Sequence, residues 1–152
     1  METLKKHLIL FDAECPMCRM YTRAFVSGGL LEKEGRAAYQ DLDADACPML
    51  DRQRAVNEIA LVNLETGEVS YGIQSLFKVC AVAIPFLKRL FLFGPFILIM
   101  SKVYAFISYN RRVIVPPDES AGLFSFQPAF RLNYRIAYLV FTWLITSFSF
   151  FW

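Results

Sequence analysis

Hydrophobic residues form several short runs along this chain, and the first of them ends at a pair of cysteines. Residues 7–11 make an apolar segment of strand length, followed by an acidic turn and by Cys15-Pro16-Met17-Cys18. Apolar positions then recur at i, i+3, i+4, i+7 and i+8, which predicts a helix with one apolar face. This helix should end near Ser27-Gly28-Gly29, because glycine is common just past a helix end. The apolar positions are Met17, Met20, Tyr21, Ala24 and Phe25.

The next part of the pattern predicts a small sheet with helices packed on it. β-compatible stretches alternate with segments of helical periodicity, and a Glu-Thr-Gly turn joins the last two strands. The order strand, helix, strand, helix, hairpin, helix is typical of an α/β domain. The segments are 36–42 (strand), 49–56 (helix), 58–64 and 68–71 (hairpin strands) and 73–82 (helix).

From Pro85 the chain becomes strongly apolar. Residues 86–108 are rich in Phe, Leu and Ile, and Gly94-Pro95 should break them into two helices. Cations at both ends argue against a membrane crossing and favour a buried or interfacial helical pair. The aromatic stripe from Phe86 to Phe106 is typical of a core, although its aromatic load also suits a membrane contact. Arg111-Arg112 is typical of a solvated helix end and would also suit anionic lipid head groups.

A second apolar stretch, residues 136–152, follows a loop at 116–128 and carries no charged side chain. As a helix it would be roughly 26 Å long, against a hydrocarbon core of roughly 30 Å. We expect this tail to insert or to lie against a membrane partner; the alternative is that it folds back over residues 86–106. Arg131 and Arg135 precede the tail, and no secretory signal is apparent, so we expect the cytoplasmic face of the inner membrane.

Composition limits the remaining possibilities. With 152 residues the chain is expected to form one domain, divided into a core at 1–84, an apolar helical extension at 85–115 and a loop and tail at 116–152. The net charge of +2 gives no reason to expect nucleic acid as a partner. Hydrophobic residues make up 56% of the chain, above the usual figure of about 45–50%. Four cysteines are too few for a disulfide scaffold of this length.

The cysteine pair has a predicted chemistry. Pro16 fits the first helical position, which makes Cys15 the capping residue and places Cys18 one turn further in. Unpaired backbone N–H groups and the helix dipole favour the Cys15 thiolate, which is the nucleophile in disulfide exchange. Cys18 would then resolve the mixed disulfide. Asp12 ends the first strand, where it could lie beneath the sulfurs as a proton acceptor.

Other interpretations of these residues remain open. The two cysteines could be inert and buried, or they could form half of a zinc site completed by two of His7, Cys47 and Cys80. Asp12 and Glu14 could belong to a solvated turn. Cys47 lies in a loop-like segment and could be a redox partner, whereas Cys80 falls on the apolar face of its helix and is typical of a core.

Residues 8–18 resemble the DCC family of predicted thiol–disulfide oxidoreductases, which is named for an Asp-x-x-Cys-x-x-Cys signature, here Asp12, Cys15 and Cys18. The hairpin at 65–67 and Tyr109-Asn110-Arg111-Arg112 also look like that family, so the resemblance covers residues 7–115. It implies a thioredoxin-like fold and exchange with a protein thiol or disulfide, without a cofactor. The tail looks like the extended ends of some bacterial members.

One departure from ordinary thioredoxins concerns substrate binding. Thioredoxins carry a cis-proline before the hairpin, facing the active site, whereas residues 53–57 contain no proline. The resemblance therefore implies a thioredoxin-like α/β domain with an apolar C-terminal extension, but not ordinary peptide binding. The sequence predicts a thiol–disulfide oxidoreductase; the alternatives are a non-catalytic, membrane-associated interaction subunit and a zinc-binding module.

Overall fold

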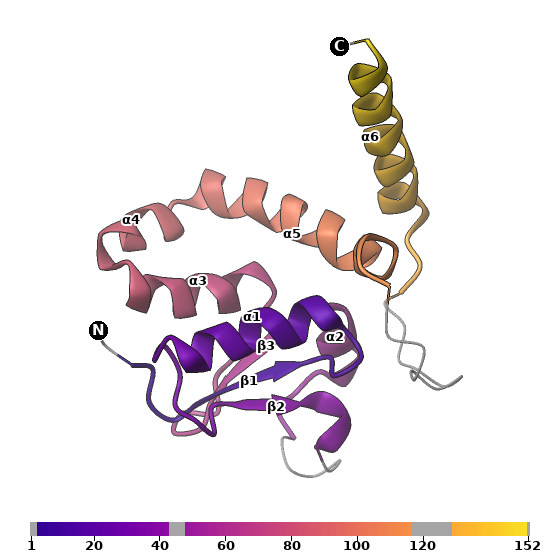
Figure 1. The fold of residues 1–152 in the computed structure, drawn as a ribbon. Coiled ribbons are helices and arrows are strands. Elements are labelled where there is room, and N and C mark those ends of the chain that lie inside the picture. The colour runs from indigo at the N-terminus through magenta and orange to yellow at the C-terminus, as the bar shows by residue number, and fades with distance from the viewer. Residues whose placement is uncertain (1–2, 43–47, 117–128, 152) are drawn as a thin grey trace.

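A four-stranded sheet lies at the centre of the computed structural model, which describes residues 3–42, 48–116 and 129–151. Its strand order is β2-β1-β3-β4 (Figure 1). β1 (His7–Phe11) pairs in parallel with β2 (Arg36–Ala38) and antiparallel with β3 (Ala60–Asn63), and β3 pairs antiparallel with β4 (Val69–Tyr71). This mixed sheet with packed helices agrees with the predicted thioredoxin-like α/β fold.

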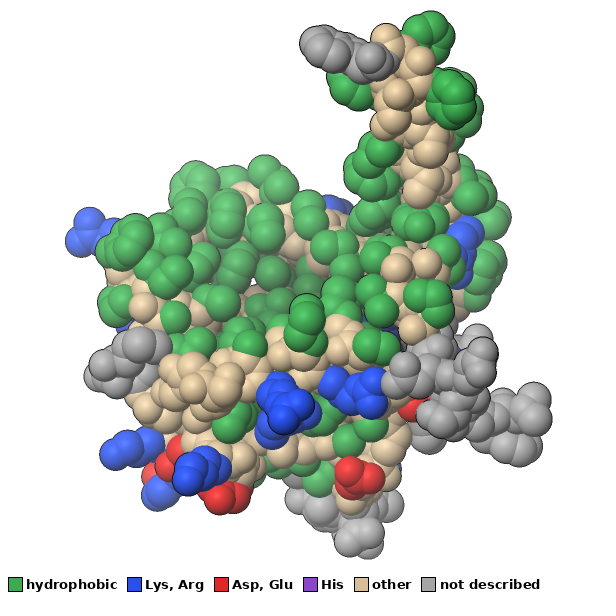
Figure 2. Space-filling model, in the orientation of Figure 1, with side chains coloured by type: hydrophobic (Ala, Val, Ile, Leu, Met, Phe, Trp, Pro, Cys, Tyr) green, Lys and Arg blue, Asp and Glu red, His purple; other side chains and the backbone are tan. Residues whose placement is uncertain are grey.

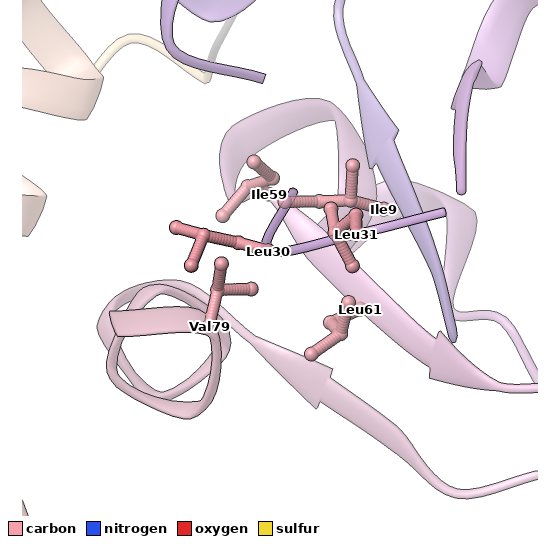
Figure 3. Close-up of a cluster of buried hydrophobic side chains, with 6 residues drawn as sticks. All are labelled: Ile9, Leu30, Leu31, Ile59, Leu61 and Val79. Atoms are coloured by element: carbon pink, nitrogen blue, oxygen red, sulfur yellow. The ribbon is translucent and has the colours of Figure 1, made fainter. Parts of the chain in front are cut away.

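Helices α1 (Pro16–Ser27) and α3 (Ile73–Ala83) cover one face of the sheet. Side chains alternate along β1, so Ile9 points to these helices and Leu10 points to the other face. Figure 3 shows the main buried cluster, in which strand, loop and α3 side chains meet. Its members are Ile9, Leu30, Leu31, Ile59, Leu61 and Val79.

Helix α2 (Arg52–Asn57) is short and leads directly into β3. It begins later than the predicted 49–56 because Asp51 is its cap, and the Asp51 side chain accepts a hydrogen bond from the Arg54 N–H. β2 ends at Ala38 rather than at residue 42, because the chain turns there into a 3₁₀ helix at Tyr39–Asp41. Cys47 and residues 117–128 lie outside the described residues.

The predicted apolar face of α1 was partly wrong. Tyr21 and Phe25 pack on the core as expected, but Met20 is exposed. Cys18 and Thr22 are the buried residues of the helix. Thr22 tolerates burial because its hydroxyl donates a hydrogen bond to the Cys18 carbonyl oxygen at 2.7 Å.

The apolar extension forms two helices and a sharp bend. A 3₁₀ turn (Pro85–Leu87) and α4 (Lys88–Phe91) meet α5 (Gly94–Ile114) at 87°, and the break at Leu92-Phe93 comes directly before the predicted Gly94-Pro95. No single described helix is long and apolar enough for a membrane span; the bent pair passes that test by length and composition alone.

Helix α6 (Leu132–Phe150) projects away from the sheet (Figure 1). It packs on the C-terminal half of α5, where Phe106 contacts the rings of Tyr138 and Phe141, and none of its residues is buried. The tail thus folds back only on the Phe106 end of residues 86–106, and the rest of that stretch, including Leu98 and Ile99, stays exposed. The predicted core role of the aromatic stripe is wrong at its start, since Phe86 is 79% exposed.

Candidate active site

Cys15 caps α1, as the sequence predicts. Its backbone is extended (φ −90°, ψ 108°), and its Sγ accepts a hydrogen bond from the Cys18 N–H at 3.3 Å. Pro16 occupies the start of the helix, where its missing N–H removes no hydrogen bond. Both cysteines are free thiols, with only 6% of Cys15 and 5% of Cys18 exposed. The two sulfurs thus share a nearly dry site at the N-terminus of the helix.

The pair is electrostatically asymmetric. A hydrogen bond from the Cys18 thiol lowers the pKa of Cys15; burial opposes this, while the Cys18 N–H and the charge of Arg111 reinforce it. The same thiol–thiol hydrogen bond and burial raise the pKa of Cys18 well above its ordinary value. Cys15 is therefore the residue that ionises first, and Cys18 is the one that keeps its proton.

Asp12 lies at the end of β1 and is 2% exposed. Its Oδ2 accepts a hydrogen bond from Arg111 at 2.6 Å, and its Oδ1 accepts from Gln40 at 2.8 Å and from the Glu14 N–H at 3.0 Å. The solvated-turn interpretation is therefore wrong for Asp12. Its proposed role as a proton acceptor stays a prediction, because these contacts show only how the carboxylate is held.

Arg111 reaches this carboxylate from the last turn of α5. It is 5% exposed, also donates to the Val56 carbonyl oxygen at 3.0 Å, and its buried Nε–H has no acceptor among the described residues. Its neighbour Arg112 pairs with Glu14 at 2.9 Å in a more exposed position. The prediction of a solvated, or lipid-facing, Arg111-Arg112 pair is therefore wrong for Arg111, because its charge is balanced inside the protein.

The same face of α5 holds the backbone from the last residues of α2 to the start of β3. The Arg111 guanidinium donates to the Val56 oxygen, the Ser108 hydroxyl donates to the Asn57 oxygen, and the Tyr104 hydroxyl accepts from the Ile59 N–H at 2.9 Å. No cis peptide bond occurs in the described part of the chain. This backbone, which contains no proline, is therefore bound by the protein's own helix.

The other predicted site residues lie apart from this cluster. His7 begins β1 and its Nδ1 lies 2.7 Å from the Lys5 oxygen. Cys80 is half-buried on α3, where burial raises its pKa. Within the described ranges no three potential metal ligands of the His, Cys, Asp or Glu type come together. The zinc interpretation therefore has no support there.

Two residues beside Asp12 were not predicted from the sequence. Gln40 bridges the Asp12 carboxylate and the Ala13 N–H, and no local pattern marks it. Tyr39 lies beside Asp12; its burial, and then the carboxylate charge, raise its pKa. A sequence feature could have indicated the role of Arg111. It is a cation in a stretch without acidic residues, whereas the cysteine turn contains two carboxylates and few neighbouring cations to neutralise them.

Comparison with known proteins identifies a family that this chain matches. No curated protein and no solved structure matches the chain significantly. Residues 9–115 match the sequence profile of the DCC1-like thiol-disulfide oxidoreductases. This segment includes Asp12, both site cysteines and Arg111, and it spans well over half of the chain. The protein therefore belongs to the DCC1-like thiol-disulfide oxidoreductase family.

Proposed function

We propose that this protein is an enzyme that exchanges disulfides with protein substrates through Cys15 and Cys18. Family membership supports a redox role. The observation that carries the finer assignment is the cap geometry, in which the Cys15 sulfur accepts the Cys18 N–H at 3.3 Å. A thiolate in that position is stabilised by the backbone donors of the helix start, whereas Cys18 has no such position.

The proposed reaction has two exchange steps. The Cys15 thiolate attacks a substrate disulfide, forms a mixed disulfide and releases the other substrate sulfur as a thiolate. Cys18 then loses its proton and attacks the Cys15 sulfur, which forms the Cys15–Cys18 disulfide and releases the second substrate thiolate. The substrate gains two electrons and the cysteine pair loses two; the reverse sequence oxidises a substrate dithiol. Asp12 is the proposed acceptor of the Cys18 proton, with Arg111 as its counter-charge.

Trapping tests this assignment. Cys18→Ser should accumulate mixed disulfides with substrates in cells, because attack remains possible and resolution is lost. Cys15→Ser should trap nothing, and Cys80→Ser is the matched control that should behave like the unmodified protein. Normal turnover by Cys18→Ser would remove Cys18 from the resolving role and make Cys47 the next candidate.

The second candidate is a non-catalytic subunit that docks on a membrane protein through its apolar helices. The supporting observation is α6, a helix with no buried residue. In both cases we place the protein at the cytoplasmic face of the inner membrane, with residues 136–152 as the contact. Cys15→Ser separates the two functions: the subunit would keep its cellular role without exchange activity, and the oxidoreductase would lose it.

A further inference from the structure

The C-terminal half of α5 turns polar side chains toward the sheet domain, and the helix leaves apolar side chains exposed on its other side. A surface helix of a soluble domain normally turns its apolar face to the core and its polar face to water. Here Tyr104, Ser108 and Arg111 face residues 1–84, which we call the redox domain, as their hydrogen bonds show. Leu98 and Ile99, on the other side, are 68% and 64% exposed.

This outward face continues around the bend into α4. We call residues 85–103 the elbow. Figure 2 shows hydrophobic side chains gathered over α4 and α5 and continuing along α6. Contiguous exposed apolar surface of this kind marks an interaction site, whereas isolated exposed hydrophobic residues are ordinary. The exposed apolar residues of the elbow are Phe86, Leu90, Leu92, Phe93, Leu98, Ile99 and Val103.

All charged side chains of the elbow are positive. Lys88, Arg89 and Lys102 are exposed, and residues 69–117 contain no acidic side chain. Of the 14 acidic residues in the chain, all except Asp118 and Glu119 lie in the first 68 positions. A surface that combines apolar side chains with Lys and Arg, and lacks carboxylates, is complementary to a layer of anionic head groups over hydrocarbon.

We propose that the elbow docks on the surface of an anionic lipid bilayer. The apolar side chains would enter the boundary between head groups and acyl chains, while the three cations would extend their charged ends to lipid phosphates. Because Arg111, eight residues beyond the elbow, holds Asp12 and Val56 on the opposite face of α5, docking would leave the cysteine pair on the side of α5 that faces away from the lipid. This contact is additional to the tail and does not rest on the proposed redox activity.

Liposome flotation of the full-length protein tests the inference. Two liposome types are used: phosphatidylcholine alone, and phosphatidylcholine with phosphatidylglycerol in equal parts. The protein should bind the anionic liposomes much more strongly. The triple substitution K88Q/R89Q/K102Q should reduce that affinity on the order of 100-fold, because each cation near the surface contributes about five-fold. A double substitution, L98Q/I99Q, should weaken binding to both liposome types.

A matched control removes the same charge elsewhere. Lys5, Arg23 and Lys33 are exposed on the redox domain, so K5Q/R23Q/K33Q should leave binding unchanged. Unchanged Cys15 alkylation in every variant would show that the fold is intact. Equal losses in the two triple variants would overturn the inference, as would the absence of any preference for anionic liposomes. Strong binding that ignores the elbow substitutions would also overturn it and would assign membrane binding to the tail.

Discussion

The Arg111 guanidinium lies 2.6 Å from the Asp12 carboxylate although 99 residues separate them in the sequence. Their side chains are 5% and 1% exposed, so solvent screens the pair very little. The contact joins the last turn of α5 to the turn that precedes the cysteines. α5 is therefore an integral part of the site, and the redox domain depends on its apolar extension for a buried counter-charge.

Removing Arg111 should destabilise the protein severely. Arg111→Met leaves the Asp12 carboxylate buried without its cation, which typically costs about 3–5 kcal/mol of unfolding free energy. Arg112→Met is the control: its pair with Glu14 is partly exposed, and such pairs contribute about 0–1 kcal/mol. Urea denaturation measures both. Equal effects would mean that the buried pair contributes little, and a double variant with Asp12→Asn should recover part of the loss.

The two thiols should titrate separately. The hydrogen bond from the Cys18 thiol lowers the pKa of Cys15 to about 6, so its alkylation rate should rise through that pH, whereas Cys18 should react only under much more alkaline conditions. The reduced, unsubstituted protein is alkylated at a series of pH values, and peptide mass spectrometry locates the label. Titration of both thiols near the free-cysteine value of about 8.5 would contradict the cap assignment.

The Cys15 shift should also make stability depend on pH. Between pH of about 6 and about 8.5, Cys15 is a thiolate in the folded state and a thiol in the unfolded state. The unfolded state then binds more protons, so stability rises with pH in this window and is lost as pH falls through the folded pKa. The slope can reach about 1.4 kcal/mol per pH unit. Cys15→Ser should flatten it, as measured by urea denaturation of the reduced proteins.

Gly72 should be intolerant of a side chain. It adopts φ +59° at the start of α3, and a Cβ there would lie 3.0 Å from the Glu58 Oε2 and 3.2 Å from the Tyr104 ring. Gly72→Ala should cost about 1–3 kcal/mol, because strain in a rarely populated backbone region adds to the crowding. Gly94→Ala is the control, since no heavy atom lies within 4 Å of its Cβ position. Thermal denaturation that ranks the two variants equally would contradict this prediction.

Local signals were enough to predict the first part of the fold. β1, the Cys15 cap, the helix stop near Gly28 and the hairpin around Gly67 each depend on neighbouring residues, and the structure confirms them. The predicted ends of secondary-structure elements were wrong where a side chain contacts a residue that is distant in the sequence. β2 is shorter than predicted because Gln40 turns toward Asp12, and a single sequence does not show that contact.

The surroundings of the cysteines could not be predicted in the same way. Helical spacing relates Tyr104, Ser108 and Arg111, but periodicity does not say which face of α5 is inside. The usual rule assigns the apolar face to the core, whereas the buried residues of α5 are the polar Ser108, Asn110 and Arg111. The rule therefore failed at Arg111, which it places in solvent and which is 5% exposed.

Removal of the tail should change how the protein is held at a membrane. Residues 136–152 carry no charge, so their contact with lipid or with a membrane protein should resist high salt. The proposed elbow contact is partly electrostatic, and salt should weaken it. A version ending at Leu132 lacks nearly all of α6. After a high-salt wash of the membrane fraction, we expect the full-length protein in the pellet and the shortened version in the supernatant. A shortened version that stays in the pellet, or a full-length protein that is released, would show that the tail is not the anchor.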